Sequence, residues 1–266
     1  MTCSTQTVNI GAVRYLNTRP LIYGLGDTAP WANVVLETPR CLAEQLESGH
    51  IDIGLVPSVE YPRLGGAIIP DISISSYGDV LSVLLISNKE LDQVERLGLD
   101  VSSLSSVALT RVLCREWFGI EPQFVDCPPD PSLLESHMDA QLFIGDPAMK
   151  IDSSPYPYVY DLGMEWEQMT GLPFVYAFWL ARSTDVDERL VTVLTEAKRE
   201  GLKHLDEIVE EESHRLGLAK PTCHRYLSEV IGYGLGEREA AGLNRFYELC
   251  FKHKLIPSWP GLEFLF

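Results

Sequence analysis

The chain has 266 residues, 45% of them hydrophobic, and carries 21 basic against 38 acidic residues, a formal net charge of −17. This size predicts one large domain or two smaller lobes with a substantial core. Nucleic-acid binders need basic surface to neutralise phosphates, and anionic membranes repel acidic chains, so neither kind of partner is expected. An anionic small molecule remains compatible, because local donors inside a cleft can override the net charge.

The sequence predicts a cytoplasmic protein with reduced thiols. The first residues, MTCSTQTVN, lack the basic start and apolar stretch of a signal peptide, and no window approaches the roughly 20 apolar residues of a membrane span. The cysteines show neither CxxC pairing nor metal-ligand spacing, so we expect free thiols, several of them buried, with a single disulfide as the alternative. These cysteines are Cys3, Cys41, Cys114, Cys127, Cys223 and Cys250.

The first third of the chain alternates apolar runs with segments of helical pattern. Strands are expected at residues 8–13, 34–38, 51–57, 67–76 and 80–87. Pro20 suits the first position of a helix, and a second helix should run from Pro39 to a stop at Gly49. This rhythm predicts an α/β fold with a mostly parallel sheet covered by helices on both faces.

A polar break at residues 88–104 precedes a second alternation. A helix is expected in 105–119, with Leu109, Val112, Leu113 and Trp117 on one stripe. Strands are expected at 122–127, 140–146 and 174–181, and the chain is helical after Asp185, including a helix within 237–255. We predict a first lobe formed by 1–88 plus 186–266 and a second by 89–185, with the tail packed on the first lobe and a hinged cleft between them.

Two stretches near the ends of predicted strands carry candidate site residues. In RYLNTRP, residues 14–20, Asn17 can donate and accept hydrogen bonds and Arg19 can bind a carboxylate through two donors. The alternative is a polar turn capped by Thr18 with a surface arginine. Ser82 interrupts the apolar run 80–87, and its alternative is a packed serine bonded to backbone.

Two further stretches lie in the second alternation. Ser103, Ser105 and Ser106 precede a predicted helix, so hydroxyls and free N–H groups could hold an anion there, although simple capping is the alternative. Gly145 would allow close backbone approach after a strand, and Asp146 could orient a ligand hydroxyl. A Gly-Asp-Pro turn is the alternative for this pair.

The usual catalytic signatures are missing from the sequence. There is no GxSxG elbow, HExxH pair, P-loop or GxGxxG, and all six histidines lie outside the four stretches. The histidines are therefore expected to have structural or surface roles.

Several stretches resemble one known family in their order along the chain. IGAVRYLNTRPLIYGL, LESGHIDIGLVPSVEY, SVLLIS, SSVAL, FIGDPAM and DLGMEWEQMTGLPFVYAFW, within residues 10 to about 180, resemble chorismate dehydratases of the futalosine route to menaquinone. The resemblance implies a two-lobed periplasmic-binding-protein-like (type 2) fold with an inter-lobe cleft. It implies no metal and no cofactor, with chorismate dehydrated to 3-[(1-carboxyvinyl)oxy]benzoate.

The resemblance also implies roles for individual residues. Asn17 and Ser82 match the catalytic positions, and the substrate-binding positions are Tyr15, Arg19, Ser105, Ser106, Gly145 and Asp146. One departure is that Ser103-Leu104-Ser105-Ser106 stands where the family is expected to have Ser-Arg-Thr-Ser.

Aromatisation drives the implied reaction, so the protein must mainly hold a dianion in one conformation and exclude water. An amide such as Asn17 is no base at neutral pH, and the hypothesis is that the substrate's enolpyruvyl carboxylate takes the proton. Two alternatives are the related dihydroxynaphthoate synthase and a non-catalytic cytoplasmic binding protein or sensor for a cyclic carboxylate.

Overall fold

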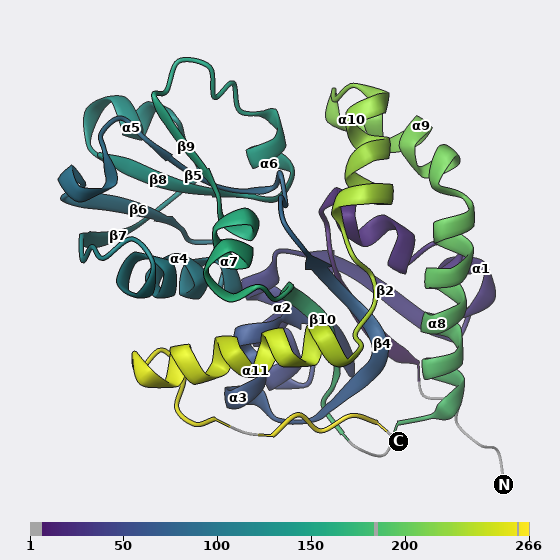
Figure 1. The fold of residues 1–266 in the computed structure, drawn as a ribbon. Coiled ribbons are helices and arrows are strands. Elements are labelled where there is room, and N and C mark those ends of the chain that lie inside the picture. Colours follow the sequence, from purple (N-terminus) through teal and green to yellow (C-terminus); the bar gives the residue numbers. More distant parts are fainter. Residues whose placement is uncertain (1–6, 184–185, 260, 266) are drawn as a thin grey trace, which may run out of the picture.

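The chain folds into two lobes, each built around a five-stranded sheet (Figure 1). The computed structural model describes residues 7–183, 186–259 and 261–265. Cys3 and the predicted lobe limit at Asp185 therefore lie outside the described residues.

The sheet of the first lobe has the strand order β2-β1-β3-β10-β4. Strand β1 pairs in parallel with β2 and β3, whereas β10 pairs antiparallel with both β3 and β4. Four strands therefore run in one direction and β10 runs against them. The strands are β1 (Val8–Val13), β2 (Ala32–Glu37), β3 (Ile53–Pro57), β4 (Ala67–Ser76) and β10 (Phe174–Ala181).

The sheet of the second lobe has the order β7-β6-β8-β5-β9, and here β5 is the reversed strand. Each sheet is thus mixed, with two parallel and two antiparallel pairings, so the predicted mostly parallel sheet holds for the direction of four strands in five but not for the pairings. The prediction missed β6, which lies inside the supposed break at 88–104, and it also missed the short β9. The strands are β5 (Val83–Ser87), β6 (Arg96–Asp100), β7 (Gln123–Cys127), β8 (Ala140–Ile144) and β9 (Tyr158–Asp161).

The chain crosses between the lobes earlier than the sequence suggested. Strand β5 belongs to the second sheet and β10 to the first, so the crossings lie in 77–82 and 162–173. The predicted limits at 88/89 and 185/186 differ from this, because apolar runs 67–76 and 80–87 look alike in sequence but enter different sheets. The crossing at 77–82 leads directly into β5 and carries Ser82.

Helix α2 begins at Pro39 and ends before Gly49, whose φ of +75° gives the left-handed stop that the sequence predicted. Pro20 does not begin a helix, because it lies near the end of the 3-10 helix η1. Trp117 lies beyond the end of α4 and is 43% exposed, so it does not belong to the buried stripe. The helices up to residue 170 are η1 (Leu16–Leu21), α1 (Leu25–Thr28), α2 (Pro39–Ser48), η2 (Ser58–Glu60), α3 (Tyr61–Leu64), η3 (Leu91–Gln93), α4 (Ser105–Glu116), α5 (Ser132–Ser136), α6 (Gly145–Lys150) and α7 (Leu162–Thr170).

The C-terminal part is helical and packs mainly on the first lobe, as the sequence predicted. Helix α8 contacts η1 and β4, and α11 contacts β10. Figure 1 shows α9 and α10 rising beside the second lobe near α6. This tail consists of α8 (Glu188–Lys203), α9 (Leu205–Leu216), α10 (Lys220–Arg225), the π-helix η4 (Tyr226–Val230) and α11 (Glu237–Lys252).

The two lobes are in contact across the cleft. Arg40 Nε on α2 donates to Val101 O at 2.7 Å, and Lys252 on α11 forms an ion pair with Glu116 on α4 at 2.7 Å. One large buried apolar cluster includes residues of both lobes. The lobes are therefore closed on each other in this structure.

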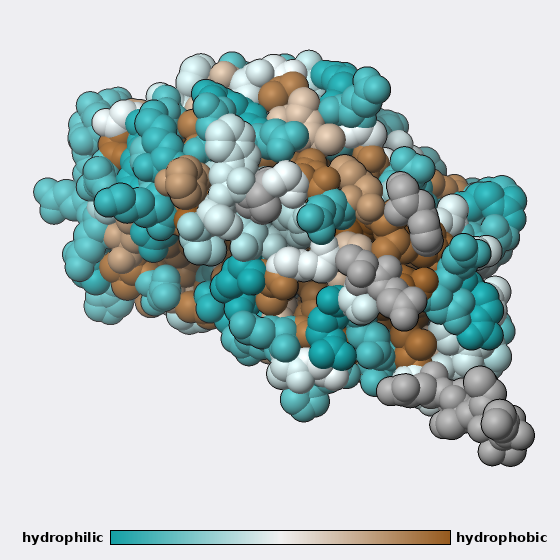
Figure 2. Space-filling view, turned by 90° about the horizontal axis from the view of Figure 1, so that it is seen from below, coloured by the Kyte–Doolittle hydropathy of each residue, from teal (hydrophilic) through white to brown (hydrophobic). Residues whose placement is uncertain are grey.

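Seen from below, the molecule carries hydrophilic side chains around much of its edge and hydrophobic ones gathered to the right of centre (Figure 2).

Candidate active site

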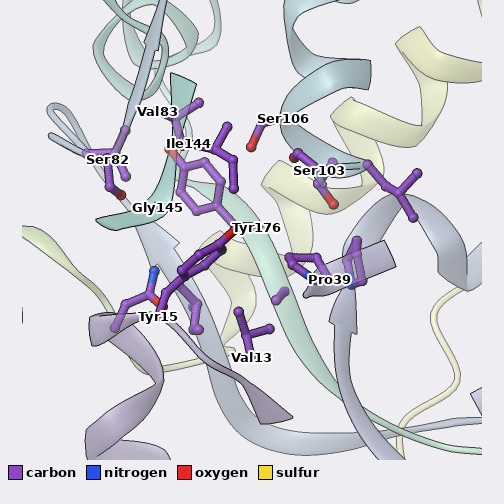
Figure 3. Close-up of a pocket in the computed structure, with 17 residues that line it drawn as sticks. Val13, Tyr15, Pro39, Ser82, Val83, Ser103, Ser106, Ile144, Gly145 and Tyr176 are labelled. Atoms are coloured by element: carbon purple, nitrogen blue, oxygen red, sulfur yellow. The ribbon is translucent and has the colours of Figure 1, made fainter. Parts of the chain in front are cut away.

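A pocket lies between the lobes, with a cavity volume of about 60 Å³. Both lobes contribute to its wall. Figure 3 shows Ser82 and Gly145 on one side of it and Ser103 and Ser106 on the other. Its lining residues are Val13, Tyr15, Asn17, Pro39, Pro57, Ile74, Val80, Ser82, Val83, Ser103, Leu104, Ser105, Ser106, Ile144, Gly145, Tyr176 and Ala177.

The pocket brings together most of the site residues that the sequence predicted. All four stretches contribute to its wall, although they are separated by up to about half of the chain. Arg19 and Asp146 do not line it. The predicted residues that do are Tyr15, Asn17, Ser82, Ser105, Ser106 and Gly145.

The two predicted catalytic residues are joined by a tyrosine of the C-terminal tail. Asn17 Nδ2 donates to the hydroxyl of Tyr226 at 3.1 Å, and that hydroxyl donates to Ser82 Oγ at 2.8 Å. Tyr226 is 1% exposed and lies behind the pocket wall rather than in it. Ser82 is therefore held by a hydrogen bond and is not a merely packed serine.

The segment before Ser82 is held in an unusual conformation. Leu81 has φ +59°, in the left-handed region that non-glycine residues rarely occupy. The Asp161 carboxylate at the end of β9 accepts the N–H groups of Val80 at 3.0 Å and Leu81 at 2.7 Å, and also caps α7. Strain of this kind persists only where the surroundings impose it and gathers at functional sites. The contacts of Asp161 thus fix the direction in which the chain presents Ser82.

Asp161→Asn is expected to lower the free energy of unfolding by about 3 kcal/mol, since hydrogen bonds to a charged group contribute about 1.5–3 kcal/mol each. The asparagine amide keeps one acceptor oxygen, but its NH2 group would face the backbone N–H groups that now donate to the carboxylate. Urea denaturation would measure the loss. Asp152→Asn is the matched control, because that carboxylate is exposed and accepts the N–H of Ser154 at 3.0 Å. Equal losses in both variants would contradict a special role for Asp161.

The N-terminus of α4 provides a second polar region in the wall. The residue before the helix, Leu104, offers no side-chain cap, so the first N–H groups of α4 are not capped by it. Ser103 and Ser106 are 4% and 6% exposed, and no hydrogen bond to either side chain is found in the described part of the chain. Their hydroxyls and the helix N-terminus suit a carboxylate.

Ser105 has a different role from its two neighbours. Its hydroxyl lies 3.2 Å from Ser58 Oγ and accepts the N–H of Val59 at 3.2 Å. Both of these residues belong to η2 of the first lobe. Ser105 lines the pocket, but its hydroxyl takes part in hydrogen bonds that join the two lobes.

Tyr15 closes the pocket against Gly145. A Cβ added to Gly145 would lie 2.9 Å from three atoms of the Tyr15 ring, and Gly145 has φ +65°. The Tyr15 hydroxyl lies 3.4 Å from Ser102 Oγ of the second lobe, and burial raises the pKa of Tyr15 above its usual value. Gly145 thus permits the close approach of the Tyr15 ring, and its predicted contact with a substrate stays a prediction.

Asp146 also joins the lobes. Its Oδ1 accepts the backbone N–H of Leu16 at 2.8 Å, and its Oδ2 lies 3.6 Å from the Arg215 guanidinium on α9. Burial raises the pKa of this carboxyl, with the Leu16 bond and Arg215 acting in the opposite direction. Asp146 therefore holds the loop that carries Tyr15 and Asn17 instead of lining the pocket.

Arg19 points away from the pocket. Its Nε lies 3.0 Å from Glu212 Oε1 on α9, a carboxylate that also pairs with Arg215 at 2.5 Å. The sequence could not show this, because Glu212 is nearly 200 residues away in the C-terminal tail. The structure places Arg19 in the packing of the tail and outside the pocket wall.

Arg19→Ala is expected to leave the KM for the pocket's ligand within about twofold and to lower the free energy of unfolding by about 1–2 kcal/mol. Glu212 is buried, and it keeps Arg215 as a partner, so the loss stays below that for a fully unpaired buried charge. Steady-state kinetics and denaturation would measure both. Arg245→Ala, which breaks the exposed pair with Glu248, is the control and should change neither. A tenfold rise in KM would restore the predicted binding role.

None of the residues that line the pocket is Asp, Glu, Lys, Arg or His. Its titratable side chains are Tyr15 and Tyr176, and burial raises the pKa of both. Within the described ranges, no group of three or more His, Cys, Asp or Glu side chains is arranged for a metal ion. Any ionised ligand must be held by hydroxyls, amides and backbone N–H groups.

Other features concern the chain as a whole. Cys41 is partly exposed, the other four described cysteines are buried, and all five are free, as predicted. Burial raises the pKa of the Cys114 thiol to about 12, so that thiol stays protonated. None of the described helices has both the length and the apolarity needed to cross a membrane.

These lobes, crossings and pocket define a periplasmic-binding-protein-like α/β protein with an inter-lobe site. Protein AF1704 from Archaeoglobus fulgidus has a similar structure, with a TM-score of 0.76 and 18% identity, covering 96% of this chain and 100% of that one. The periplasmic aliphatic sulphonate-binding protein SsuA from Escherichia coli is similar with a TM-score of 0.61 and 17% identity, covering 97% and 90%. At these identities the likeness concerns the fold.

The sequence comparisons identify the family. Residues 8–252 match the model described as menaquinone biosynthesis. The chorismate dehydratase of Thermus thermophilus is 33% identical over 90% of this chain and 93% of the relative, and that of Campylobacter jejuni is 27% identical over 80% and 81%. The chain therefore belongs to the menaquinone biosynthesis family and is an enzyme of that pathway, as the sequence motifs predicted.

Sequence reasoning missed Tyr226, Asp161 and Tyr176 as parts of the site. Tyr176 lies in a predicted strand, but alternation alone did not indicate that it faces the pocket. Asp161 is the first residue of the quoted family stretch DLGMEWEQMTGLPFVYAFW, but that resemblance did not assign it a role. Tyr226 reaches the site only through long-range folding, and none of the quoted stretches includes it.

Proposed function

We propose that this chain removes water from chorismate to give 3-[(1-carboxyvinyl)oxy]benzoate, a carbon–oxygen lyase reaction. Two relatives at 33% and 27% identity are chorismate dehydratases. The observation that carries the proposal is the closed inter-lobe pocket in which Asn17 and Ser82 face an uncapped helix N-terminus. Such a pocket suits a compact ligand with two carboxylates.

The two polar regions of the wall divide the work of binding. The α4 N-terminus with Ser103 and Ser106 suits one carboxylate, because its N–H groups and hydroxyls are free to donate. Asn17 and Ser82 lie across the pocket and would orient the ring hydroxyl and the enolpyruvyl carboxylate. Leu104 contributes no charge, so this carboxylate would be held without an arginine.

The pocket favours proton removal by the substrate itself. The described lining residues include no His, Asp, Glu, Lys or Cys, and the raised pKa values of Tyr15 and Tyr176 keep both phenols protonated. In the proposed reaction the enolpyruvyl carboxylate takes one ring proton, the C–H electron pair enters the ring, and the ring hydroxyl leaves. That hydroxyl departs as water with one proton, and the ring becomes aromatic.

The closed lobes would supply the remaining requirement, which is a fixed substrate conformation shielded from water. Tyr15 against Gly145 and Asp146 against Leu16 N–H close one side of the pocket. Holding reacting groups in one geometry can replace much of the work of a strong base.

The test is to mix the purified protein with chorismate, without added metal or cofactor, and to follow products by chromatography and mass. We expect a species lighter by one water, with an aromatic absorption spectrum, at a rate proportional to protein concentration. A heat-inactivated sample controls for spontaneous decay of chorismate. Unchanged chorismate together with a ligand-induced rise in Tm would instead indicate a binding protein.

A further inference from the structure

The hydroxyl of Tyr226 occupies a special place in the hydrogen bonding behind the pocket. It accepts from Asn17 Nδ2 at 3.1 Å and donates to Ser82 Oγ at 2.8 Å. A phenol has one proton to donate, and that proton is committed to Ser82. The serine's own proton is then free, and the described residues offer Ser82 Oγ no other hydrogen-bond partner.

We infer that Tyr226 is a positioning residue that fixes Ser82 as a hydrogen-bond donor aimed into the pocket, an inference that rests on the proposed function. The chain runs in one direction, from the Asn17 amide through the Tyr226 hydroxyl to the Ser82 hydroxyl and then to the ligand. Hydrogen bonds in such a chain polarise one another, so Ser82 becomes a stronger donor. Its target is the ring hydroxyl that departs or the carboxylate that takes the proton.

The surroundings of Tyr226 suit a fixed hydroxyl rather than an acid or base. Its side chain is buried, and burial raises its pKa well above the usual value, so the hydroxyl stays neutral. Tyr226 begins the π-helix η4, a rare geometry that is frequent at functional sites. Asn17 belongs to η1, Ser82 to a crossing between lobes and Tyr226 to the tail, so one hydroxyl aligns three separate parts of the chain.

The experiment compares Tyr226→Phe with wild type in chorismate turnover. The variant keeps the ring and loses one hydroxyl, and we expect kcat to fall at least tenfold with KM changed by less than threefold. Tyr233→Phe is the matched control, because Tyr233 is also a buried tyrosine of the tail and its hydroxyl has no partner in the described part of the chain. That control should keep wild-type kcat, and melting curves would show that both variants fold.

A double-mutant cycle with Ser82→Ala separates positioning from general support of the fold. If Tyr226 acts through Ser82, adding Tyr226→Phe to Ser82→Ala lowers kcat by less than twofold. Wild-type kcat in Tyr226→Phe, or a full tenfold loss in both backgrounds, would overturn the inference. If wild type binds chorismate without converting it, the proposed function fails separately. The inference then falls with the proposed function, whereas wild-type turnover with unchanged kcat in Tyr226→Phe overturns the inference alone.

Discussion

Replacing Gly145 with alanine is expected to lower kcat/KM for chorismate at least a hundredfold. The added Cβ would lie 2.9 Å from the Tyr15 ring, a separation that Cβ atoms essentially never show. The ring must move, and with it the contact that closes the lobes over the pocket. Because the contact forms only on closure, the open protein should still fold and the loss should appear mainly in turnover.

The left-handed backbone conformation of Gly145 also affects the stability of the alanine variant, and a control variant can separate this effect from the contact with Tyr15. Gly171 has φ +69°, close to the +65° of Gly145, but a Cβ there would meet no atom within 4 Å. Both alanine variants should lose about 1–2 kcal/mol of stability from the left-handed conformation. Gly171→Ala should keep full activity. Similar kcat/KM values in the two variants would show that the Tyr15 contact does not matter for catalysis.

Asn17→Ala and Ser82→Ala are each expected to lower kcat by about 10²–10³-fold, the usual loss when one donor to a developing charge is removed. KM should change much less, because the α4 N-terminus still holds a carboxylate. Single-turnover mixing of enzyme in excess over chorismate, with product followed by mass, would separate chemistry from binding.

Asn33→Ala serves as the matched control for the asparagine variant. Asn33 is an exposed residue of β2 whose amide bonds to Asn9, outside the pocket, so its removal should leave kcat unchanged. Full turnover by Asn17→Ala with normal substrate affinity would rule out the proposed role of Asn17.

The fold was largely predictable from the alternation of apolar runs and helical stretches. Residues 67–76 and 174–181 form strands with the expected limits, and α2 has the expected stop at Gly49. The membership of strands in sheets was not predictable, because β10 inserts between β3 and β4 from more than 95 residues further along the chain. Periodicity describes one strand at a time and carries no information about such partners.

The candidate site was likewise only partly predictable from the sequence. Asn17 and Gly145 follow strands and Ser82 directly precedes the reversed strand β5. All three lie at strand ends near the cleft, and local pattern and family resemblance indicated them. Arg19 and Asp146 belong to the same motifs but are used by Glu212 and by the Leu16 N–H, both of them tertiary partners. A motif thus predicts which loop reaches the site but not which of its side chains face the ligand.

The insertion of β10 between β3 and β4 also sets an order for folding on the ribosome. The second sheet is drawn from one uninterrupted stretch, 83–161, whereas the first cannot join β4 to β3 until residue 181 has emerged. The sheet of the second lobe can therefore be complete before the sheet of the first lobe. Until β10 is synthesised, the place between β3 and β4 stays empty. Unpaired strand edges are prone to association, so the nascent chain is most exposed to aggregation during synthesis of residues 76–174.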